Sequence, residues 1–474
     1  MRYDIPRLLL ALAGIALFVS PGLGLAQVIS PLRRLSLAAR AAWAYLLGVA
    51  WVAGGAYVAS HVFGLLLKRG LFLWLAAVPV VAGLVSFLIR RRQAGLPTVR
   101  RRRPRDPVAM AALASAVFVC TGLYAEALRN PLADWDGRMT WFAQARFVRE
   151  ARTVDAMAIR EDRWFLTNRR YPLLMPLAQI AVQETLDLSD DERAVRPLYA
   201  TFLPVFLLLL WSGALRLSGA RAAAMAVLAA SVVPYLAFHN HGGAAGGYSD
   251  FPFGCFLGAG ALLLLLGRTR SAGLGAGLLL AAAILTKREG LPAALACLTI
   301  GAAWVILPGR RDGGRSVVAT APLLSAFAVV VAAGAFFAHW ASGIVRDDWD
   351  EGYVHALTNG ENWRMFLPRL TSALPRMARE MFDLSQWGIL WVVVPLVVLA
   401  GGAALRRPRV RALVALSFVS PALGLAAYGL ASDPPGLAAV TWSRFLVQAS
   451  LPLFLLMACC LRKGLAGRGV GAQR

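Results

Sequence analysis

The sequence predicts an all-α integral membrane protein with about thirteen transmembrane helices. Of its 474 residues, 58% are hydrophobic, and the mean hydropathy is +0.62. Soluble domains are usually only about 45–50% apolar. The apolar residues gather in repeated runs of about twenty, the length that crosses a bilayer as a helix. Short arginine clusters separate the runs, as is typical of loops held on the cytoplasmic side.

Each apolar run is a predicted transmembrane helix. In chain order the runs lie at 8–29, 41–66, 71–89, 107–125, 197–215, 222–238, 251–267, 272–286, 291–307, 317–338, 387–404, 411–430 and 445–461. The first run begins like a signal peptide but continues to Ile29, so we expect a retained helix. We divide the chain into N-terminal membrane helices with a basic cytoplasmic loop (1–106), the main transmembrane domain (107–461) and a cytoplasmic tail (462–474).

The arginine clusters set the expected orientation. The strongest cluster lies between Arg90 and Arg105, and its excess of arginine predicts a cytoplasmic loop. Alternation along the chain then places the other clusters on the same side: Arg216/Arg221, Arg268/Arg270, Arg310/Arg311/Arg315, Arg406/Arg407/Arg409/Arg411 and Arg462/Lys463. The net charge of +24 therefore reflects contacts with anionic headgroups, and we expect no nucleic-acid partner.

The outer side receives the loops that carry most of the other polar residues. Two of these loops are large, at 126–196 and 339–386, and we expect short interfacial helices in both. Met139 to Glu150 contains no Gly or Pro, and it places Trp141, Ala145 and Val148 on one helical face. Asn362 to Phe382 mixes apolar and arginine side chains, and Pro368 and Pro375 predict a break into short pieces.

Asp134 and Asp136 stand at the start of the first large outer loop. A carboxylate at a membrane surface can act as a general base. In an extended segment both acids point to the same side, whereas in a helix they diverge by about 200° and only one faces a pocket. Two other interpretations stay open: the pair holds a divalent cation through its oxygens, or Asp136 caps the following helix.

Thr286 to Gly290 is a short polar break between two apolar runs, and it contains the adjacent cations Lys287 and Arg288. Two cations at an outer membrane rim suit a lipid-linked phosphate, because lysine offers a point charge and arginine a bidentate fork. Arg444, at the outer start of the last predicted helix, is a further candidate. The alternative is that these side chains are membrane anchors, with Glu289 as a partner.

A Gly-rich outer loop carries His239, His241, Tyr248 and Asp250. Two histidines two positions apart are a weak metal pattern, so a flexible loop beside a binding pocket is the favoured interpretation. Tyr171 opens a stretch with two prolines, which predicts the rigid start of a helix too short to span. None of the five cysteines has metal-ligand spacing, and we expect no disulfide framework.

These motifs, in this order, resemble the membrane-embedded GT-C superfamily of glycosyltransferases. The likeness is greatest to the polyprenyl- or dolichyl-phosphate-sugar-dependent enzymes of family 39 and of the aminoarabinose-transferase type, and it covers roughly residues 107–461. It rests on Asp134-Trp-Asp136, Tyr171-Pro-Leu-Leu, Tyr248-Ser-Asp250, Thr286 to Gly290 and Arg444-Phe-Leu446. The chain departs from the family at Gly137, since many members have an acidic pair such as Asp-Glu there.

The resemblance implies a GT-C-like bundle in a bacterial inner membrane, with the active site facing the periplasm and residues 107–461 as the catalytic domain. It implies transfer, with inversion, of a hexosyl, pentosyl or aminosugar group from a polyprenyl-phosphate donor. The acceptor would be a hydroxyl of a glycan, lipid or protein. Membrane lipids are the other expected partners.

The resemblance also implies roles for single residues. Asp136, or failing it Asp134, would be the catalytic base. The donor and its phosphate would be bound by Lys287, Arg288, Arg444, Tyr171, Tyr248 and Asp250. We assign no metal ligand, and a divalent cation is an open alternative. The rival function is a transporter or flippase of lipid-linked or small polar substrates, a class that places polar sites on broken helices near the midplane.

Overall fold

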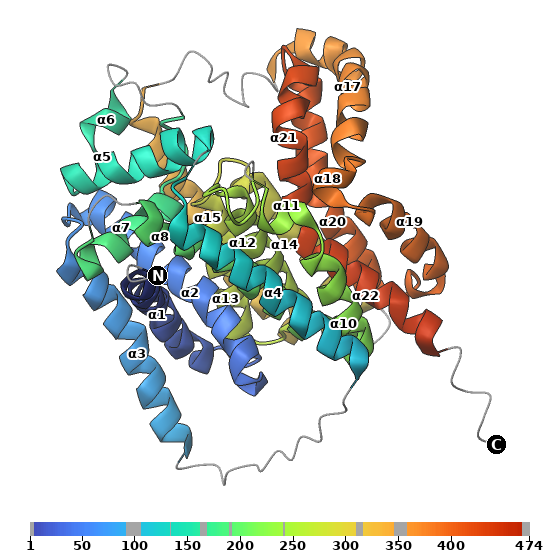
Figure 1. Ribbon diagram of the computed structural model, residues 1–474, viewed down its shortest axis with the longest axis horizontal. Helices are drawn as coiled ribbons and strands as arrows, with labels where there is room; N and C mark the ends of the chain where they lie inside the picture. Colours follow the sequence, from blue (N-terminus) through green and yellow to red (C-terminus); the bar gives the residue numbers. More distant parts are fainter. Residues whose placement is uncertain are drawn as a thin grey trace.

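A computed structural model describes residues 4–91, 106–132, 134–161, 168–188, 192–239, 242–309, 316–345 and 358–466. Within these residues the regular secondary structure is entirely helical (Figure 1). The helices are α1 (Asp4–Val28), η1 (Leu32–Arg34), α2 (Leu37–Phe63), α3 (Arg69–Arg91), α4 (Pro107–Arg129), η2 (Gly137–Phe142), α5 (Ala143–Ala151), α6 (Met157–Arg160), α7 (Leu174–Leu186), α8 (Glu192–Ala200), α9 (Phe202–Ser218), α10 (Ala220–Ser231), α11 (Pro234–Ala237), α12 (Asp250–Leu266), α13 (Arg270–Ile284), α14 (Gly290–Gly309), α15 (Ser316–Ser342), α17 (Gly360–Met381), α18 (Leu384–Trp387), α19 (Leu390–Ala400), η3 (Gly402–Ala404), α20 (Pro408–Leu430), α21 (Pro434–Gln448) and α22 (Ser450–Ala466).

The helices have the length and composition of a helical membrane protein. Among the described residues, seven are long and apolar enough to cross a membrane: Ile5–Val28, Leu37–Phe63, Arg69–Ile89, Pro107–Arg129, Arg193–Ser218, Thr320–Ser342 and Pro408–Leu430. An eighth span is formed if α21 and α22, which are bent by 53° at their junction, are counted as one. The prediction of an all-α chain with apolar helices long enough to span a membrane is therefore confirmed for the described residues.

The predicted number of full spans is not confirmed. Each predicted apolar run coincides with a helix, but α10, α12, α13, α19 and the stretch Gly290–Ala303 of α14 have 17 residues or fewer and are shorter than the seven candidate spans. The run at 222–238 shows the reason, because its helix ends at Ser231 and Pro234 begins a separate short helix. Hydropathy counts apolar residues and does not register such a backbone break.

Some predicted features fall outside the described residues. They are the basic loop at 92–105, the arginines Arg310, Arg311 and Arg315, the histidine His241, residues 346–357 of the second outer loop, and the end of the tail at 467–474.

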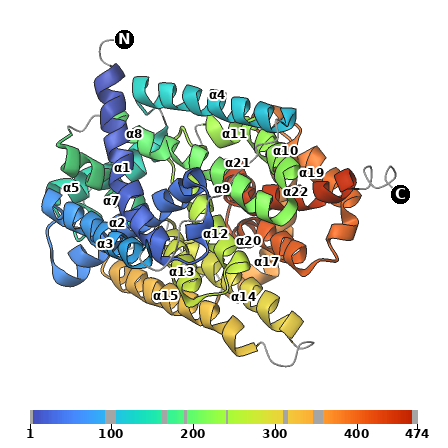
Figure 2. The same cartoon turned by 90° about the horizontal axis from the view of Figure 1, so that it is seen from below.

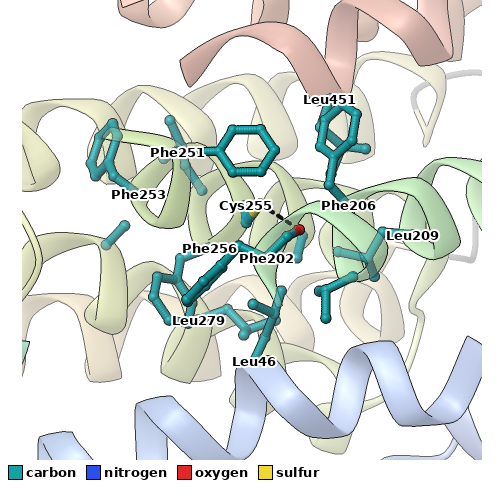
Figure 3. Packing of buried hydrophobic residues seen from close by; sticks show 14 of the residues in the cluster. Leu46, Phe202, Phe206, Leu209, Phe251, Phe253, Cys255, Phe256, Leu279 and Leu451 are labelled. Carbon is teal, nitrogen blue, oxygen red and sulfur yellow. Dashed lines mark hydrogen bonds between the residues drawn. The ribbon is translucent and has the colours of Figure 1, made fainter. Parts of the chain in front are cut away.

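The core is centred on α12. Its residues from Asp250 to Leu265 are all buried, and it packs against α9, α13, α14, α21 and α22. Figure 3 shows aromatic side chains of α9 and α12 meeting leucines of α2, α13 and α22. The rings of Phe202 and Phe256 lie 5.6 Å apart in an edge-to-face arrangement, which aromatic pairs prefer. This packing fixes the end of α12 that carries Asp250.

Glycine permits a close crossing of α12 and α21. A Cβ atom on Gly254 would lie 2.8 Å from the Cα and 3.0 Å from the carbonyl oxygen of Gln448. Because any larger residue would push the two helices apart, Gly254 holds the start of α12 against the end of α21. The first three helices also join this body, since α2 packs against α7, α9 and α13.

The first large outer loop folds into short helices, as predicted. Trp141, Ala145 and Val148 are buried, so the predicted apolar face is confirmed. These helices run across one end of the bundle, near the ends of α2 and α15 (Figures 1 and 2).

The prediction for the second outer loop is wrong in one respect, because α17 is one continuous helix of 22 residues that includes Pro368 and Pro375. It packs along α20 and α21. Phe366 lies so close to α20 that a Cβ on Gly429 would be 2.3 Å from its ring. Each proline removes one backbone hydrogen bond, and packing against two helices keeps the helix intact despite that loss.

Candidate functional site

A polar cavity lies where five parts of the chain meet. It contains about 240 Å³ of empty space, part of it open to the exterior. The lining residues come from the segment around η2, from the loop before α7, from the turn between α13 and α14, and from the ends of α12 and α21: Asp136, Thr140, Trp141, Asn168, Tyr171, Asp250, Lys287 and Arg444. Five of these eight are residues for which the sequence predicts a site role.

A π-helical turn aims one face of η2 at the cavity. The residues Gly137–Phe142 have π-helical geometry, in which positions four and five apart share a face. Asp136, Thr140 and Trp141 have this spacing, and all three line the cavity. The side chain of Asp136 makes no capping hydrogen bond, so the capping interpretation of this residue is wrong.

Asp136 forms an ion pair with Arg444 across the cavity. The distance from Arg444 Nη2 to Asp136 Oδ2 is 2.6 Å, and the side chains are 17% and 29% exposed. The guanidinium of Arg444 also lies 4.6 Å from the ring centre of Tyr248, within reach of a cation–π contact. Burial and the nearby carboxylate of Asp136 raise the pKa of Tyr248, so its hydroxyl stays protonated and neutral at ordinary pH.

Lys287 is the centre of a second, buried network. Its Nζ lies 2.6 Å from Asp250 Oδ1 and 2.8 Å from Glu289 Oε1. Gln448 Nε2 donates to the same oxygen of Asp250 at 2.9 Å. Burial opposes the charge on Lys287, but Asp250 and Glu289 outweigh burial and raise the pKa of the ammonium group. Lys287 is therefore a paired interior cation, and the membrane-anchor interpretation is wrong for this residue.

The turn between α13 and α14 gives Lys287 its position. Thr286 Oγ1 donates to the carbonyl of Ala282 at 2.6 Å and closes the end of α13. A Cβ on Gly290 would lie 2.4 Å from the carbonyl oxygen of Ala283, so the sharp return into α14 requires glycine there. Leu174 N donates to the carbonyl of Leu285 at 2.9 Å, which ties the start of α7 to this turn.

Arg288 and Tyr171 meet at the edge of the cavity. The guanidinium carbon of Arg288 lies 4.8 Å from the ring centre of Tyr171. The same ring is 5.3 Å from Trp141 in an edge-to-face arrangement. Burial raises the pKa of Tyr171, which keeps its hydroxyl neutral. Tyr171 thus lines the cavity. Arg288 is not among the lining residues, and it contacts the ring of Tyr171.

The two acids of the first motif occupy different surroundings. Asp134 is buried with 7% exposure and is not among the residues that line the cavity. Its backbone carbonyl accepts a hydrogen bond from Arg138 N at 3.1 Å. Of the two candidate bases, Asp136 is therefore the one whose carboxylate faces the cavity.

The Gly-rich loop before α12 is packed, not exposed. Its described residues 242–249 are buried, and Arg196 donates a hydrogen bond to its backbone. Arg196 Nη2 pairs with Glu126 Oε2 at 2.7 Å and donates to the carbonyl of Ala245 at 3.0 Å, while Nη1 donates to the carbonyl of Asn130. One buried arginine therefore joins the end of α4, the start of α8 and the loop that carries Tyr248.

Three lining residues, Thr140, Trp141 and Asn168, are absent from the predicted site residues, and so is Gln448, which donates to Asp250. Gln448 could have been found from its spacing, because it lies four residues after Arg444 and so on the same helical face. Thr140 lies four residues after Asp136, but its place depends on the π-turn, which leaves no reliable sequence signal. Asn168 precedes the predicted Tyr171 element, and its contribution depends on the path of the loop.

The described residues contain no group of three or more His, Cys, Asp or Glu side chains arranged to hold a metal ion. His239 stacks on Tyr235 with ring centres 4.2 Å apart. The cavity instead brings together one partly exposed carboxylate, two paired cations and two neutral aromatic side chains. Chemically, this set can accept a proton from a hydroxyl and stabilise a negatively charged group.

Comparison of the chain with protein-family models, with curated proteins and with solved structures found no match.

Proposed function

We propose that this protein is a glycosyltransferase of the GT-C type, embedded in a bacterial inner membrane, which transfers a sugar from a polyprenyl-phosphate donor. One observation carries the proposal: a carboxylate, Asp136, and two cations, Lys287 and Arg444, line the same cavity. These are the groups that such a reaction needs, a proton acceptor and positive charge for a phosphate. A lipid-linked donor suits a site on the outer face, where sugar nucleotides are not available.

In the proposed reaction, Asp136 takes the proton from an acceptor hydroxyl as its oxygen attacks the anomeric carbon. The bond from that carbon to the phosphate oxygen breaks, and the polyprenyl phosphate leaves with the bonding electrons. The configuration at the anomeric carbon inverts. A phosphate leaves without a general acid, so one carboxylate is sufficient, in contrast to the pair that glycosidases use.

The cations act on the leaving group. Arg444 holds Asp136 at 2.6 Å in the structure, and the donor phosphate competes with that carboxylate for the same guanidinium. Binding of the donor therefore transfers Arg444 from the base to the phosphate, where it stabilises the charge that grows as the bond breaks. Lys287, fixed by Asp250 and Glu289, adds a positive charge at a constant position.

A transporter or flippase is the second candidate, and the buried network around Lys287 favours it. Ionisable residues in the interior of a membrane protein often mark a pathway for a substrate or a proton. The two functions differ in their products. A transporter moves the lipid-linked sugar across the bilayer unchanged, whereas a transferase releases the lipid phosphate.

The deciding experiment uses the purified full chain in lipid nanodiscs with a panel of radiolabelled polyprenyl-phosphate sugars. Lipid, glycan and protein fractions of a bacterial envelope serve as acceptors. We expect release of polyprenyl phosphate and labelling of one acceptor fraction. Asp136→Asn should abolish both, whereas Asp187→Asn, a matched change at an exposed carboxylate, should have no effect. Flux of unchanged donor across proteoliposomes without any release of lipid phosphate would instead establish the transporter.

A further inference from the structure

The residues that line the cavity are of two chemical kinds, which we call its charged wall and its neutral wall. The charged wall consists of Asp136, Asp250, Lys287 and Arg444, and the neutral wall consists of Thr140, Trp141, Asn168 and Tyr171. The proposed reaction uses the charged wall for the acceptor proton and the donor phosphate. It assigns no role to the neutral wall, although this wall supplies four of the eight lining residues.

The neutral wall contains an unused hydrogen-bonding group. Thr140 is 2% exposed, and its hydroxyl oxygen has no hydrogen-bond partner in the structure. A buried polar group without a partner is rare and destabilising, so it usually marks a place where a ligand or water binds. The π-helical turn places Thr140 among the residues that line the same cavity as Asp136.

The rest of the wall is held rigidly. Gln144, one turn after Thr140, donates from Nε2 to the backbone carbonyl of Asn168 at 3.0 Å. Tyr171 N donates to the same carbonyl at 2.9 Å, and the Tyr171 ring packs edge to face on Trp141. The wall therefore offers the hydroxyl of Thr140, the polar side chain of Asn168 on an anchored backbone and two packed aromatic rings, a combination that matches hydroxyl groups and the apolar C–H face of a sugar ring.

The charges that line the cavity are already balanced. Asp136 pairs with Arg444, and Asp250 pairs with Lys287. A sugar with its own carboxylate group would bring a second negative charge beside the donor phosphate, and the two cations that line the cavity already face Asp136, Asp250 and that phosphate. Since a buried charge without a partner is strongly unfavourable, such sugars should bind poorly.

From these observations we infer that the neutral wall is the sugar subsite, and that it selects an uncharged hexosyl or pentosyl group over uronic acids. This inference rests on the proposed function. Thr140 makes a hydrogen bond to one ring hydroxyl of the donor sugar, and Trp141 and Tyr171 pack against the ring. The sugar is thus placed beside Asp136 while its phosphate meets Arg444 and Lys287.

The first test uses the wild-type protein alone. Two donors that share one polyprenyl chain are compared: a neutral hexosyl and a uronosyl phosphate. We expect the neutral donor to have the higher kcat/KM, by at least about tenfold, since a site with unmatched polar groups discriminates strongly. Equal use of both, or preference for the uronosyl donor, would overturn the subsite and leave glycosyl transfer intact. Absence of transfer from every donor would remove both proposals.

The second test identifies the hydroxyl that Thr140 contacts. Thr140→Val keeps the shape and removes the hydroxyl, whereas Thr140→Ser keeps the hydroxyl; Thr371→Val, at an exposed threonine, is the matched control. With a neutral donor we expect Thr140→Val to lower kcat/KM by about tenfold, and Thr140→Ser to retain most of it.

Donors that each lack one ring hydroxyl distinguish a direct hydrogen bond from Thr140 to the sugar from an indirect effect of the substitution on the fold. If Thr140 binds a ring hydroxyl, the loss caused by Thr140→Val disappears with the one donor that lacks this hydroxyl, because the interaction is then already absent. An equal loss with every deoxy donor would show a merely structural role and overturn the inference. Should Thr140→Val fail to fold, Thr140→Ala replaces it in the deoxy series, because it also removes the hydroxyl, and it decides between the same two outcomes.

Discussion

Among single residues, the aspartates of the first motif show what spacing can and cannot decide. The sequence predicts that only one of Asp134 and Asp136 faces a pocket if the segment is helical, and it leaves open which. The π-helical turn gives Asp136, Thr140 and Trp141 a shared face, and a π-turn depends on tertiary packing that no local pattern encodes. The sequence also does not show which residue pairs with Asp136, since its partner Arg444 follows it by 308 residues.

The first prediction concerns Asp136. Replacement by asparagine keeps the shape and removes the proton acceptor, so we expect the transfer rate at saturating donor to fall by about 10²–10⁴-fold. Asp134→Asn should cause a smaller loss, because Asp134 does not line the cavity. Initial rates of lipid-phosphate release measure both. A fully active Asp136→Asn together with an inactive Asp134→Asn would reverse the assignment within the pair.

The second prediction concerns Lys287. Lys287→Met fills a similar volume but leaves Asp250 and Glu289 without their cation, and breaking a buried pair costs about 3–5 kcal/mol. We therefore expect the free energy of unfolding to fall by about this amount, as well as slower turnover. Reversible unfolding in mixed micelles measures the change, with exposed Lys68→Met as the control. Unchanged stability would mean that the buried pairs contribute nothing to the fold.

At the scale of helices, hydropathy and periodicity predicted most of the elements. The apolar runs coincide with helices, and the buried face of Trp141, Ala145 and Val148 follows from helical spacing alone. The errors in helix boundaries have one physical origin: whether a helix breaks at a proline depends on tertiary packing, which the local sequence does not show. The run at 222–238 divides before Pro234, whereas α17 stays intact across Pro368 because it packs along α20 and α21.

The third prediction tests how one side chain organises several elements. Arg196→Met removes the contacts that join α4, α8 and the Gly-rich loop, and it leaves Glu126 without its partner. Since Glu126 is 33% exposed, water offsets part of the cost, and we expect a loss of roughly 2–3 kcal/mol. Thermal unfolding measures this loss. Arg146→Met, at an exposed arginine of α5, is the control, and an equally small effect of both changes would contradict the role of Arg196.

For the whole molecule, the cavity depends on convergence that the chain order does not reveal. Asp136, Lys287 and Arg444 come from distant segments, and the resemblance to a family anticipated that they belong together without giving their contacts. The close crossing of α12 and α21 at Gly254 and the turn at Gly290 bring these residues to one end of the bundle. The fold therefore determines which charges pair, and the sequence alone left that open.

The last prediction concerns orientation in the membrane. One candidate span, Pro107–Arg129, lies between the basic loop and the first large outer loop. Its surface carries exposed apolar side chains, including Phe118 at 80% exposure, as a lipid-facing helix requires. A single crossing places the two loops on opposite sides, and the arginines predict that the basic loop is the cytoplasmic one.

Cysteine labelling tests this arrangement directly. Thr98→Cys marks the basic loop, and Met157→Cys marks an exposed position, 59% accessible, in the outer loop. We expect a membrane-impermeant thiol reagent to label Met157→Cys in spheroplasts and Thr98→Cys only after permeabilisation. The wild type measures the background, which should be low because four of its five cysteines are buried. Labelling of both positions from the same side would contradict α4 as a span, and with it the outward-facing site on which a lipid-linked donor depends.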